Sequence, residues 1–501
     1  MCGIYVSLPC LPPELVATLD YILLSTICHT KYVKKFGNER IFFQIISDLN
    51  ELSTTGIVLN LSSGPQTVFF DCILLAGDNK GLNCACGFVG GFKSKCYCRI
   101  CYATSEECSK MVSELSQKLR CKNRYELDLK VGDVTKTGLK ERCVFNTINN
   151  FHIYENVSVD LMHDIWEGVA AYDLSKVIDS LIKDGTLSLD IVNSRIKSFP
   201  YIESEKRNKP RPLYYEASKK GVSKIKIRQS SAECLCLTRY LGLMIGDLVA
   251  RKNKYWKLYL YLRRITDIVT SPRLHWSEIS ELRELIQKHN KLYIELFDCL
   301  KPKMHFLVHY PGVIKKYGPL VHFSANSFER KNKAMKDHAS SSSNNIFLPL
   351  TICRKHQLQL CYTMNFSPVK NEMNLGPRQQ KTDGCAVFRK LSAYIPENSD
   401  VSELTHVEIF NKKYKPGSVI VTSADVTPHF AIIKNIYLIN TAPFFLIHYY
   451  KTESFDSHIH AWEVSYNDSD PDHLIHNFPR NPPCQFFETS TSSYITTRYK
   501  I

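Results

Sequence analysis

The chain has 501 residues, of which 44% are hydrophobic and 23% charged, and its formal net charge is +15 with a pI near 8.9. This length allows two to four domains and a large core, and the composition is that of a soluble globular protein. The sequence has no run of about 18 apolar residues, which excludes a membrane span. The positive charge favours polyanionic partners, nucleic acid before acidic membrane surfaces, over a basic protein without such a partner.

Cysteine usage indicates a reducing compartment. The chain has 19 cysteines, an odd number, scattered along its length. Some of them, such as Cys234 and Cys236, lie in apolar segments of the sequence. A disulfide scaffold of this length is not expected, whereas reduced thiols with one metal site fit the pattern. The N-terminus has no charged region ahead of an apolar core, so no signal peptide is predicted. We therefore expect a nuclear or cytoplasmic protein.

Residues 1–83 alternate between strand and helix patterns, which indicates the first part of an α/β layer. The expected elements are strands at 3–8, 57–61 and 67–76 and helices at 12–23 and 41–52. Ile73 to Ala76 reads as a buried strand that leads through Gly77 to Asp78. A carboxylate at the end of a buried strand is unfavourable unless it binds something. Asp78 is therefore a candidate for metal ligation or acid–base chemistry.

Residues 84–156 form a basic, cysteine-bearing segment in which Cys98 and Cys101 have zinc-ligand spacing. No thioredoxin-like βαβ pattern surrounds this pair, which disfavours a redox motif, and plain buried thiols are the other alternative. Tetrahedral zinc needs two further ligands. The candidates are His163, His152, Cys84, Cys86, Cys96, Cys108 and Cys143.

Residues 157–300 have a helical period and are expected to form an all-α insertion. At its start, Asp160 and His163 are one helical turn apart and face the same way, either within a site or as a hydrogen-bonded pair.

The segment 203–228 is polar and basic, and Tyr214 and Tyr215 lie among its cations. The pattern fits a phosphate backbone with stacked bases, or alternatively a solvated loop between helices. The cations assigned to nucleic acid are Lys206, Arg207, Lys209, Arg211, Lys224, Lys226 and Arg228.

Residues 301–365 are expected to return to the α/β core. Glu329 falls in the first turn of a helix with Asn326 as its predicted N-cap, so a capping glutamate is the alternative to a site residue. Three cations that follow are also assigned to nucleic acid: Arg330, Lys331 and Lys333. If the helical block is an insertion, Asp78 and Glu329 can share one core and hold divalent metal ions.

The C-terminal part has three expected regions. Residues 366–413 read as a linker rich in Pro, Asn, Gly and Lys. Residues 414–468 contain short strands separated by turns, which predicts a small β-barrel. Residues 469–501 are polar and are expected to form a loose tail.

The order of several motifs resembles a known family. From the N-terminus they are GIYVSLPCLPPE, FGNERIFFQIISDLNELSTTGI, GDN, CRIC, DLMHDIWEGV, KMHFLVHYP, YGPL, FSANSFERKNK and KHQ. In this order the chain resembles the CACTA (En/Spm-type) DNA transposases and the animal genes derived from them, over about residues 1–365. The C-terminal barrel is similar to the accessory domain of these proteins.

The resemblance implies a DDE recombinase whose RNase H-like core is interrupted by a helical insertion between the second and third catalytic acids. The implied positions are Asp78 as the second acid, Glu329 as the third, Asp160 and His163 as a D-x-x-H motif, and Cys98 and Cys101 as the C-x-x-C after the second acid. Such enzymes use bound Mg²⁺ or Mn²⁺ to cut and join DNA ends, so DNA is the expected partner.

One departure from the family matters most. Its first catalytic Asp lies on a strand upstream of the text that matches Gly3 to Ser7, and this sequence starts after that strand. A bridging carboxylate is central to a two-metal site. We therefore expect a truncated or repurposed DNA-binding protein without transposition activity. The alternatives are an active metal nuclease in which another acid, such as Asp71, substitutes, and an interaction scaffold whose barrel binds a partner protein.

Overall fold

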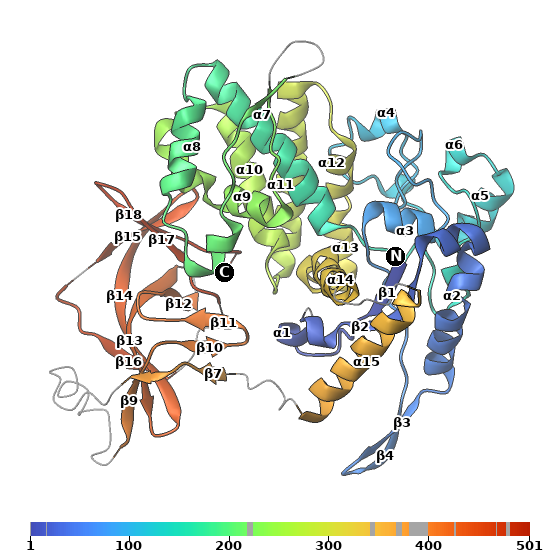
Figure 1. Ribbon diagram of the computed structural model, residues 1–501. Coiled ribbons are helices and arrows are strands. Elements are labelled where there is room, and N and C mark those ends of the chain that lie inside the picture. The colour runs from blue at the N-terminus through green and yellow to red at the C-terminus, as the bar shows by residue number, and fades with distance from the viewer. Residues whose placement is uncertain are drawn as a thin grey trace. The chain divides into compact units, whose positions relative to one another are not determined.

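The structure, a computed structural model (Figure 1), describes residues 2–16, 18–217, 224–340, 346–366, 373–379, 399–424, 427–466, 468–476 and 481–500. The chain divides into two compact units, the first spanning Met1–Asp173 and Ser271–Phe366 and the second Leu174–Thr270 and Ser367–Ile501. Both units contain helices and strands, so the chain is a mixed α/β protein as expected. Within the helical block expected at 157–300, residues 174–270 belong to the second unit, whereas residues 157–173 and 271–300 belong to the first.

The first unit begins with a small antiparallel sheet. β1 (Cys2–Val6) pairs with β2 (Leu23–Cys28), with Gly3 opposite Ile27. The helix expected at 12–23 is wrong beyond Val16, because α1 covers only Pro13–Val16 and Leu23 already begins β2. The spacing of apolar residues in this segment is helical. It is outweighed by the pairing with β1 and by the packing of Leu24 against Met335 and Ile352.

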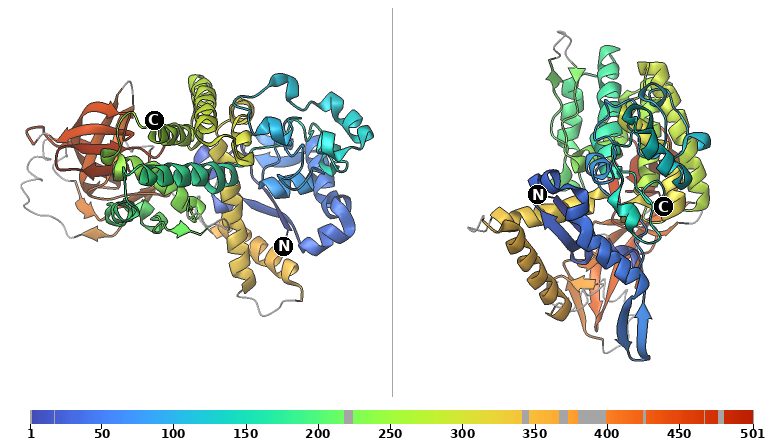
Figure 2. Two further views of the ribbon diagram at one scale, coloured as in Figure 1. Left: turned by 90° about the horizontal axis from the view of Figure 1, so that it is seen from above. Right: turned by 90° about the vertical axis from the view of Figure 1, so that its right-hand side faces the viewer.

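The helix expected at 41–52 is confirmed as part of α2 (Thr30–Thr54), which lies beside β1 and β2 (Figures 1 and 2). Its periodic apolar residues Phe42, Ile45 and Ile46 are buried in the core of this unit. The helix is interrupted at Gly37, whose φ of 79° is a conformation that glycine adopts without steric penalty.

The strand at 57–61 is confirmed, whereas the buried strand expected at 67–76 is wrong. β3 (Ile57–Leu61) turns back into β4 (Gly64–Val68), because the Ser-Ser-Gly-Pro turn folds the chain into a hairpin. In the stretch between β4 and Asp78, Leu75 is the one residue that forms a β-bridge, and it pairs with Val157 in the parallel direction. Ile73 is 50% exposed, so the segment before Asp78 is an extended surface stretch.

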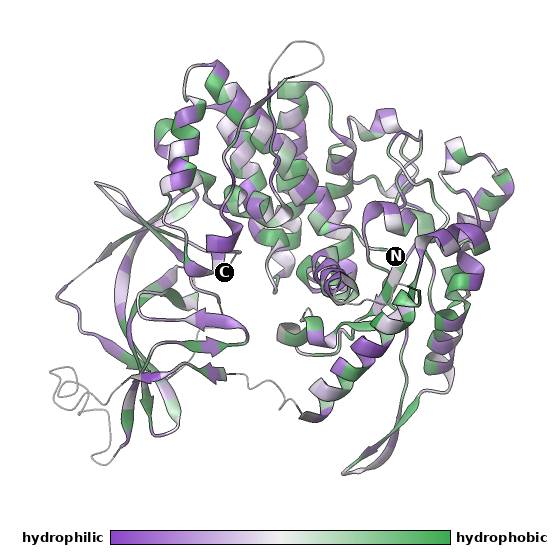
Figure 3. Cartoon of the chain, in the orientation of Figure 1, coloured by the Kyte–Doolittle hydropathy of each residue, from purple (hydrophilic) through white to green (hydrophobic). Residues whose placement is uncertain are grey.

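The other helices of the first unit pack around this sheet and around the cysteine-bearing loops. They are α3 (Asn79–Ala85), α4 (Ser105–Cys108), α5 (Tyr125–Val131), α6 (Val134–Thr137), α11 (Trp276–Phe297), α12 (Pro302–Leu307), α13 (Tyr310–Tyr317), α14 (Ala325–Ser340) and α15 (Leu348–Phe366). Figure 3 shows α14 as predominantly hydrophilic. A π-helical segment, Met162–Val169, leads into α7 (Ala170–Lys183). His289 Nε2 of α11 lies 2.6 Å from Asp173 Oδ2 of α7, and both side chains are buried.

The second unit combines helices with an antiparallel sheet. Its helices besides α7 are α8 (Leu189–Ser198), α9 (Ser231–Ile245) and α10 (Lys254–Val269). Its strands are β5 (Tyr215–Glu216), β6 (Lys224–Ile225), β7 (Met373–Leu375), β8 (Arg378–Gln379), β9 (Val401–Leu404), β10 (Val407–Ile409), β11 (Lys412–Tyr414), β12 (Val419–Ala424), β13 (Pro428–Ile439), β14 (Ala442–Asp456), β15 (Ala461–Tyr466), β16 (His473–Ile475), β17 (Gln485–Glu488) and β18 (Ser493–Thr496).

The short strands expected within 414–468 are confirmed as β12 to β15, but they belong to a larger sheet. Within the described residues this curled sheet has nine strands in the order β17-β18-β15-β14-β13-β9-β8, with β12 on β13 and β16 on β14 (Figure 1). The loose tail expected at 469–501 is therefore wrong, because it supplies β16, β17 and β18. Ile495 of β18 is fully buried in the sheet core, which explains why this polar segment is ordered.

Most of the linker expected at 366–413 lies outside the described residues, but its last part supplies β9, β10 and β11. None of the helices in the described ranges is both long and apolar enough to cross a bilayer.

Candidate metal centre and acidic cluster

Four buried side chains of the first unit form a candidate metal centre: Cys98, Cys101, His305 and His309. One ligand atom from each lies within 4.8 Å of all the others. None of the four residues is more than 1% exposed. Two thiols and two imidazoles are the donor set of structural zinc sites.

The distances in this group fit a tetrahedral metal ion. Cys98 Sγ lies 3.7 Å from His309 Nε2, Cys101 Sγ lies 3.4 Å from His305 Nε2, and the two Nε2 atoms are 3.4 Å apart. Tetrahedral zinc with ordinary Zn–S and Zn–N bonds places its ligand atoms roughly 3.3–3.8 Å apart. These three distances and the donor set therefore fit a zinc ion.

The local backbone structure directs the four side chains of the candidate metal centre toward one another. The backbone N–H of Ile100 donates to Cys98 Sγ at 3.4 Å, so the tight Cys98–Cys101 loop stabilises a thiolate. His305 lies on α12, which opens with Pro302 at its first position. His309 lies in the turn between α12 and α13, where it is the N-cap of α13 and its backbone N–H donates to the Phe306 carbonyl at 3.1 Å.

The charges around the centre favour a thiolate at Cys98, and a metal ion at this site would replace the proton on His309. Burial alone would raise the pKa of Cys98, but the hydrogen bond from Cys101 and the neighbouring His305 and His309 lower it well below its usual value. Burial would likewise lower the pKa of His309, but Cys98 and Glu114 raise it to about 9. Glu114 Oε2 lies 2.7 Å from His309 Nδ1, the arrangement in which a carboxylate orients a metal-binding imidazole.

The structure brings Cys98 and Cys101 together in a group compatible with zinc, but the other two members of this group, His305 and His309, were not among the predicted ligands. His163 lies in another cluster, and Cys84 is exposed. Other candidates have separate contacts: Arg120 donates to Cys96 at 3.5 Å, Cys108 donates to the Ala103 carbonyl at 3.6 Å, Cys86 neighbours Cys143, and His152 neighbours Asn146. The missed signal was the H-x3-H spacing of His305 and His309, which is a known zinc-ligand spacing.

An acidic cluster around His163 is the second candidate site. His163 Nδ1 lies 2.6 Å from Asp160 Oδ2, and His163 Nε2 lies 3.4 Å from Glu329 Oε1 and 3.8 Å from Glu167 Oε2. The expected side-by-side arrangement of Asp160 and His163 is therefore confirmed. The hydrogen bond to Asp160, together with the charges of Glu329 and Glu167, raises the pKa of His163 to about 9 despite partial burial.

Asp78 has a capping role that was not expected, whereas the capping alternative considered for Glu329 is wrong. Asp78 is exposed and is the N-cap of α3, where its Oδ1 accepts from the Gly81 N–H at 2.7 Å. Glu329 is not a capping residue, because α14 begins at Ala325 and Asn326 lies inside it. Burial raises the pKa of Glu329, and the charges of Asp160, Glu167 and Asp78 raise it further. Asp78 is thus close enough to Glu329 for their charges to interact.

A buried polar network joins the two candidate sites. Arg99, between the two cysteines of the candidate metal centre, is fully buried and donates to Asn79 Oδ1 at 2.7 Å. Asn79, next to Asp78, donates to Asp164 Oδ1 at 2.6 Å. Asp164 Oδ2 accepts from the Asp160 backbone N–H at 3.2 Å and from the Tyr310 hydroxyl at 3.3 Å. Burial and the charge of Asp160 raise the pKa of Asp164 to about 7.

Arg99 and Asp164 were not identified as candidate site residues from the sequence. Arg99 also donates to the Ser158 carbonyl at 2.6 Å, and its guanidinium lies 5.1 Å from the ring centroid of Phe306. Charged residues are rarely buried unless they are paired in this way. The only signal in the sequence was their position inside the CRIC and DLMHDIWEGV motifs.

The substitute acid suggested for an active nuclease lies apart from these contacts. Asp71 Oδ1 accepts from the Ser53 hydroxyl at 2.8 Å and from Asn150 Nδ2 at 3.2 Å, on an exposed part of the unit.

The cations assigned to nucleic acid do not form one group. Arg330 and Lys333 are exposed on α14, but Lys331 is only 6% exposed and donates to the Leu19 carbonyl at 2.8 Å, so its assignment to nucleic acid is wrong. In the second unit Lys206 pairs with Glu203 at 2.8 Å, Lys209 donates to the Lys197 carbonyl at 2.8 Å, and Arg207 is exposed. The other four are exposed around the β5–β6 hairpin: Arg211, Lys224, Lys226 and Arg228.

Comparison with models of protein families and with curated proteins found no match for this chain.

Proposed function

We propose that this chain is a transposase-derived, DNA-binding protein with a core related to the RNase H-like DDE recombinases. The observation that supports the proposal is the convergence of its motif segments. Asn79 of GDN, Arg99 of CRIC, Asp164 of DLMHDIWEGV and Tyr310 of KMHFLVHYP are linked by hydrogen bonds through Asp164 and Asn79. Residues so far apart in sequence contact one another when the motifs form one core, and unrelated surface loops would not do so.

We further propose that the Cys98, Cys101, His305 and His309 group binds zinc and that the zinc is structural. Thiolate and imidazole ligands favour Zn²⁺ over Mg²⁺ or Mn²⁺, which prefer oxygen. Four protein ligands complete a tetrahedron, whereas a catalytic zinc keeps one position open for water or substrate. The zinc would hold the loop that carries Arg99 against the segment that carries Tyr310.

The acidic cluster supports the absence of strand cleavage. With a pKa near 9, His163 is a cation at neutral pH and already offsets part of the negative charge of Asp160 and Glu329. A divalent metal ion would have to displace this imidazolium before it could activate a phosphodiester. The alternative is a metal nuclease that uses Asp78, Asp160 and Glu329, and the approach of Asp160 and Glu329 to the same imidazole is the observation that favours it.

Two measurements test the proposal. Fluorescence anisotropy with labelled duplex DNA is expected to give a binding constant whose logarithm falls linearly with the logarithm of NaCl concentration. Absent binding, or binding that salt does not affect, would refute the DNA-binding function and favour the interaction scaffold.

A nicking assay on supercoiled plasmid with Mg²⁺ or Mn²⁺ is expected to show no cleavage. Cleavage that Asp78→Asn and Glu329→Gln abolish, and that the surface control Glu126→Gln leaves intact, would establish the nuclease instead.

A further inference from the structure

The second unit carries a hairpin with regularly spaced cations. β5 and β6 pair antiparallel, with Tyr215 opposite Ile225. The hairpin is extended toward its open end by the Gln229 side chain, whose Oε1 accepts from the Arg211 N–H at 2.9 Å and whose Nε2 donates to the Arg211 carbonyl at 2.7 Å. We call residues 211–216 and 224–229 the basic hairpin.

Burial alternates along the second arm of the basic hairpin. Ile225 and Ile227 are 1% and 8% exposed, whereas the side chains of Lys226 and Arg228 are 60% and 53% exposed. Lys224 is also exposed. Residues two apart on an extended chain face the same side and are about 6.6 Å apart. The apolar residues therefore anchor the hairpin and present three cations in a row.

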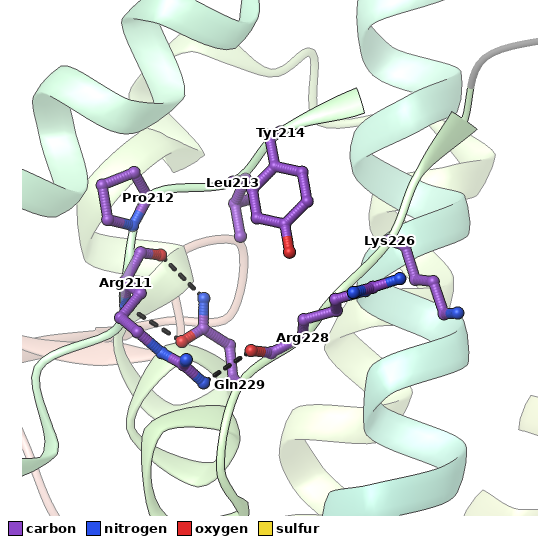
Figure 4. Close-up of a pocket in the computed structure, with 7 residues that line it drawn as sticks. All are labelled: Arg211, Pro212, Leu213, Tyr214, Lys226, Arg228 and Gln229. Atoms are coloured by element: carbon purple, nitrogen blue, oxygen red, sulfur yellow. Dashed lines mark hydrogen bonds between the residues drawn. The ribbon is translucent and has the colours of Figure 1, made fainter. Parts of the chain in front are cut away.

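A pocket lies between the two arms of the basic hairpin. Figure 4 shows Tyr214 on one side of it and Gln229, Arg228 and Lys226 on the other, with Arg211 beside Gln229. Tyr214 is 48% exposed, so its ring is available to a ligand. An accessible aromatic ring surrounded by cations is complementary to a nucleotide, which combines an anionic phosphate with a flat base.

The acidic residues near the basic hairpin do not cancel its charge. Glu216 pairs with Lys226 at 3.2 Å and also with Arg228, and Glu233 pairs with Arg211 at 3.1 Å. Two carboxylates thus face four cations when Lys224 is included. Ion pairs between exposed groups are weak, because water and salt screen them. A polyanion can therefore compete for these cations.

We infer that the basic hairpin binds single-stranded DNA, with phosphates on Arg211, Lys226 and Arg228 and one base stacked on Tyr214. This inference rests on the proposed DNA-binding function and adds the form of DNA that is recognised. Stacking on a side chain requires a base that is not already stacked in a duplex. The hairpin would therefore hold an unpaired or frayed segment, and a continuous duplex could use only its cations.

The test uses the full chain and three fluorescein-labelled probes: oligo-thymidine, an abasic oligonucleotide of the same length, and a duplex. Oligo-thymidine is expected to bind roughly 10-fold more tightly than the abasic strand, and Tyr214→Leu should remove this difference while leaving abasic binding unchanged. Lys226→Gln should reduce the slope of log K against log [NaCl] for single strands by about 0.7. A merely structural role of either residue would not produce these selective effects.

Matched controls are Tyr362→Leu, at another exposed tyrosine, and Lys252→Gln, at another exposed lysine, with circular dichroism to verify folding. Equal affinities for oligo-thymidine and the abasic strand, or no effect of Tyr214→Leu, would overturn the inference. Retained, salt-dependent duplex binding would then leave the proposed function intact. If the chain binds none of the probes, both fail.

Discussion

The metal centre and the acidic cluster belong to the same unit and share one buried network, yet their environments are opposite. All four residues of the metal centre are at most 1% exposed. In the acidic cluster the side chains of His163, Glu167 and Glu329 are 24%, 40% and 42% exposed, and only Asp160 is fully buried. One region is closed to solvent and the other is open to it.

The difference indicates a division of roles. A buried group of thiols and imidazoles, in which His305 Nδ1 has no hydrogen-bond partner among the described residues, is unfavourable unless a further ligand satisfies it, so the metal centre is expected to contribute to folding. A half-exposed charged cluster contributes little to stability because water screens it, but it is accessible to a ligand. Changes should therefore affect stability most at the metal centre and least at the outer carboxylates.

The largest effect is expected from loss of the metal. Cys98→Ser should lower the free energy of unfolding by more than about 3 kcal/mol, because the binding energy of a structural zinc is folding energy. Urea unfolding measures the loss, and metal analysis should find one zinc per chain in the wild type. Cys10→Ser, at an exposed thiol, is the control. Less than half an equivalent of zinc, together with an unchanged Cys98→Ser variant, would contradict the structural role.

A somewhat smaller effect is expected from the residue that links the two regions. Arg99→Met should lower the free energy of unfolding by about 2–4 kcal/mol, because the Asn79 and Ser158 oxygens lose their charged donor inside the core. Arg142→Met, which breaks an exposed pair with Glu126, should resemble the wild type in the same urea experiment. Similar losses in the two variants would show that the buried network is not important for stability.

The ion pair of His163 should make the free energy of unfolding depend on pH. Its folded-state pKa of about 9 exceeds the ordinary value of 6.5, so protonation stabilises the folded chain. The contribution is complete below pH 6.5 and is lost as the pH rises through about 9, and it amounts to about 1–3 kcal/mol. The difference in unfolding free energy between wild type and His163→Gln should follow this curve. A difference that does not change with pH would refute the ion pair.

The smallest effect is expected at the exposed edge of the acidic cluster. Glu329→Gln should change the free energy of unfolding by no more than about 0.5 kcal/mol, as is typical of surface positions. Chemical denaturation at neutral pH measures it beside Asp160→Asn, which removes the buried partner of His163 and should be more destabilising. If Glu329→Gln were the more harmful of the two, the open cluster would be a structural element.

The sequence predicted the helices and strands that are determined by the spacing of apolar residues close together in the chain. The spacing of Phe42, Ile45 and Ile46 predicted α2, and the alternating text between Val419 and Tyr466 predicted β12 to β15. The helix expected up to Leu23 was wrong because pairing between distant strands decided that region. The tail after Asp468 was wrong for the same reason, since its strands are stabilised by a sheet that precedes them.

The candidate sites could be predicted only in part. Cys98 and Cys101 are close in sequence and gave a spacing signal, whereas their partners His305 and His309 are more than 200 residues away. Arg99 and Asp164 look like surface residues in the sequence, because burial of a charge depends on partners that only the fold brings together. The spacing of Asp160 and His163 predicted their contact, whereas the contact of His163 with Glu329 is a tertiary property and left His163 among the candidate zinc ligands.

The long separation between the two halves of the Cys2His2 group has a consequence during synthesis on the ribosome. Cys98 and Cys101 are translated first, and His305 follows Cys101 by 204 residues. At ordinary elongation rates this interval lasts about 10–40 s. During this delay the nascent chain exposes two thiols whose histidine partners have not yet been synthesised.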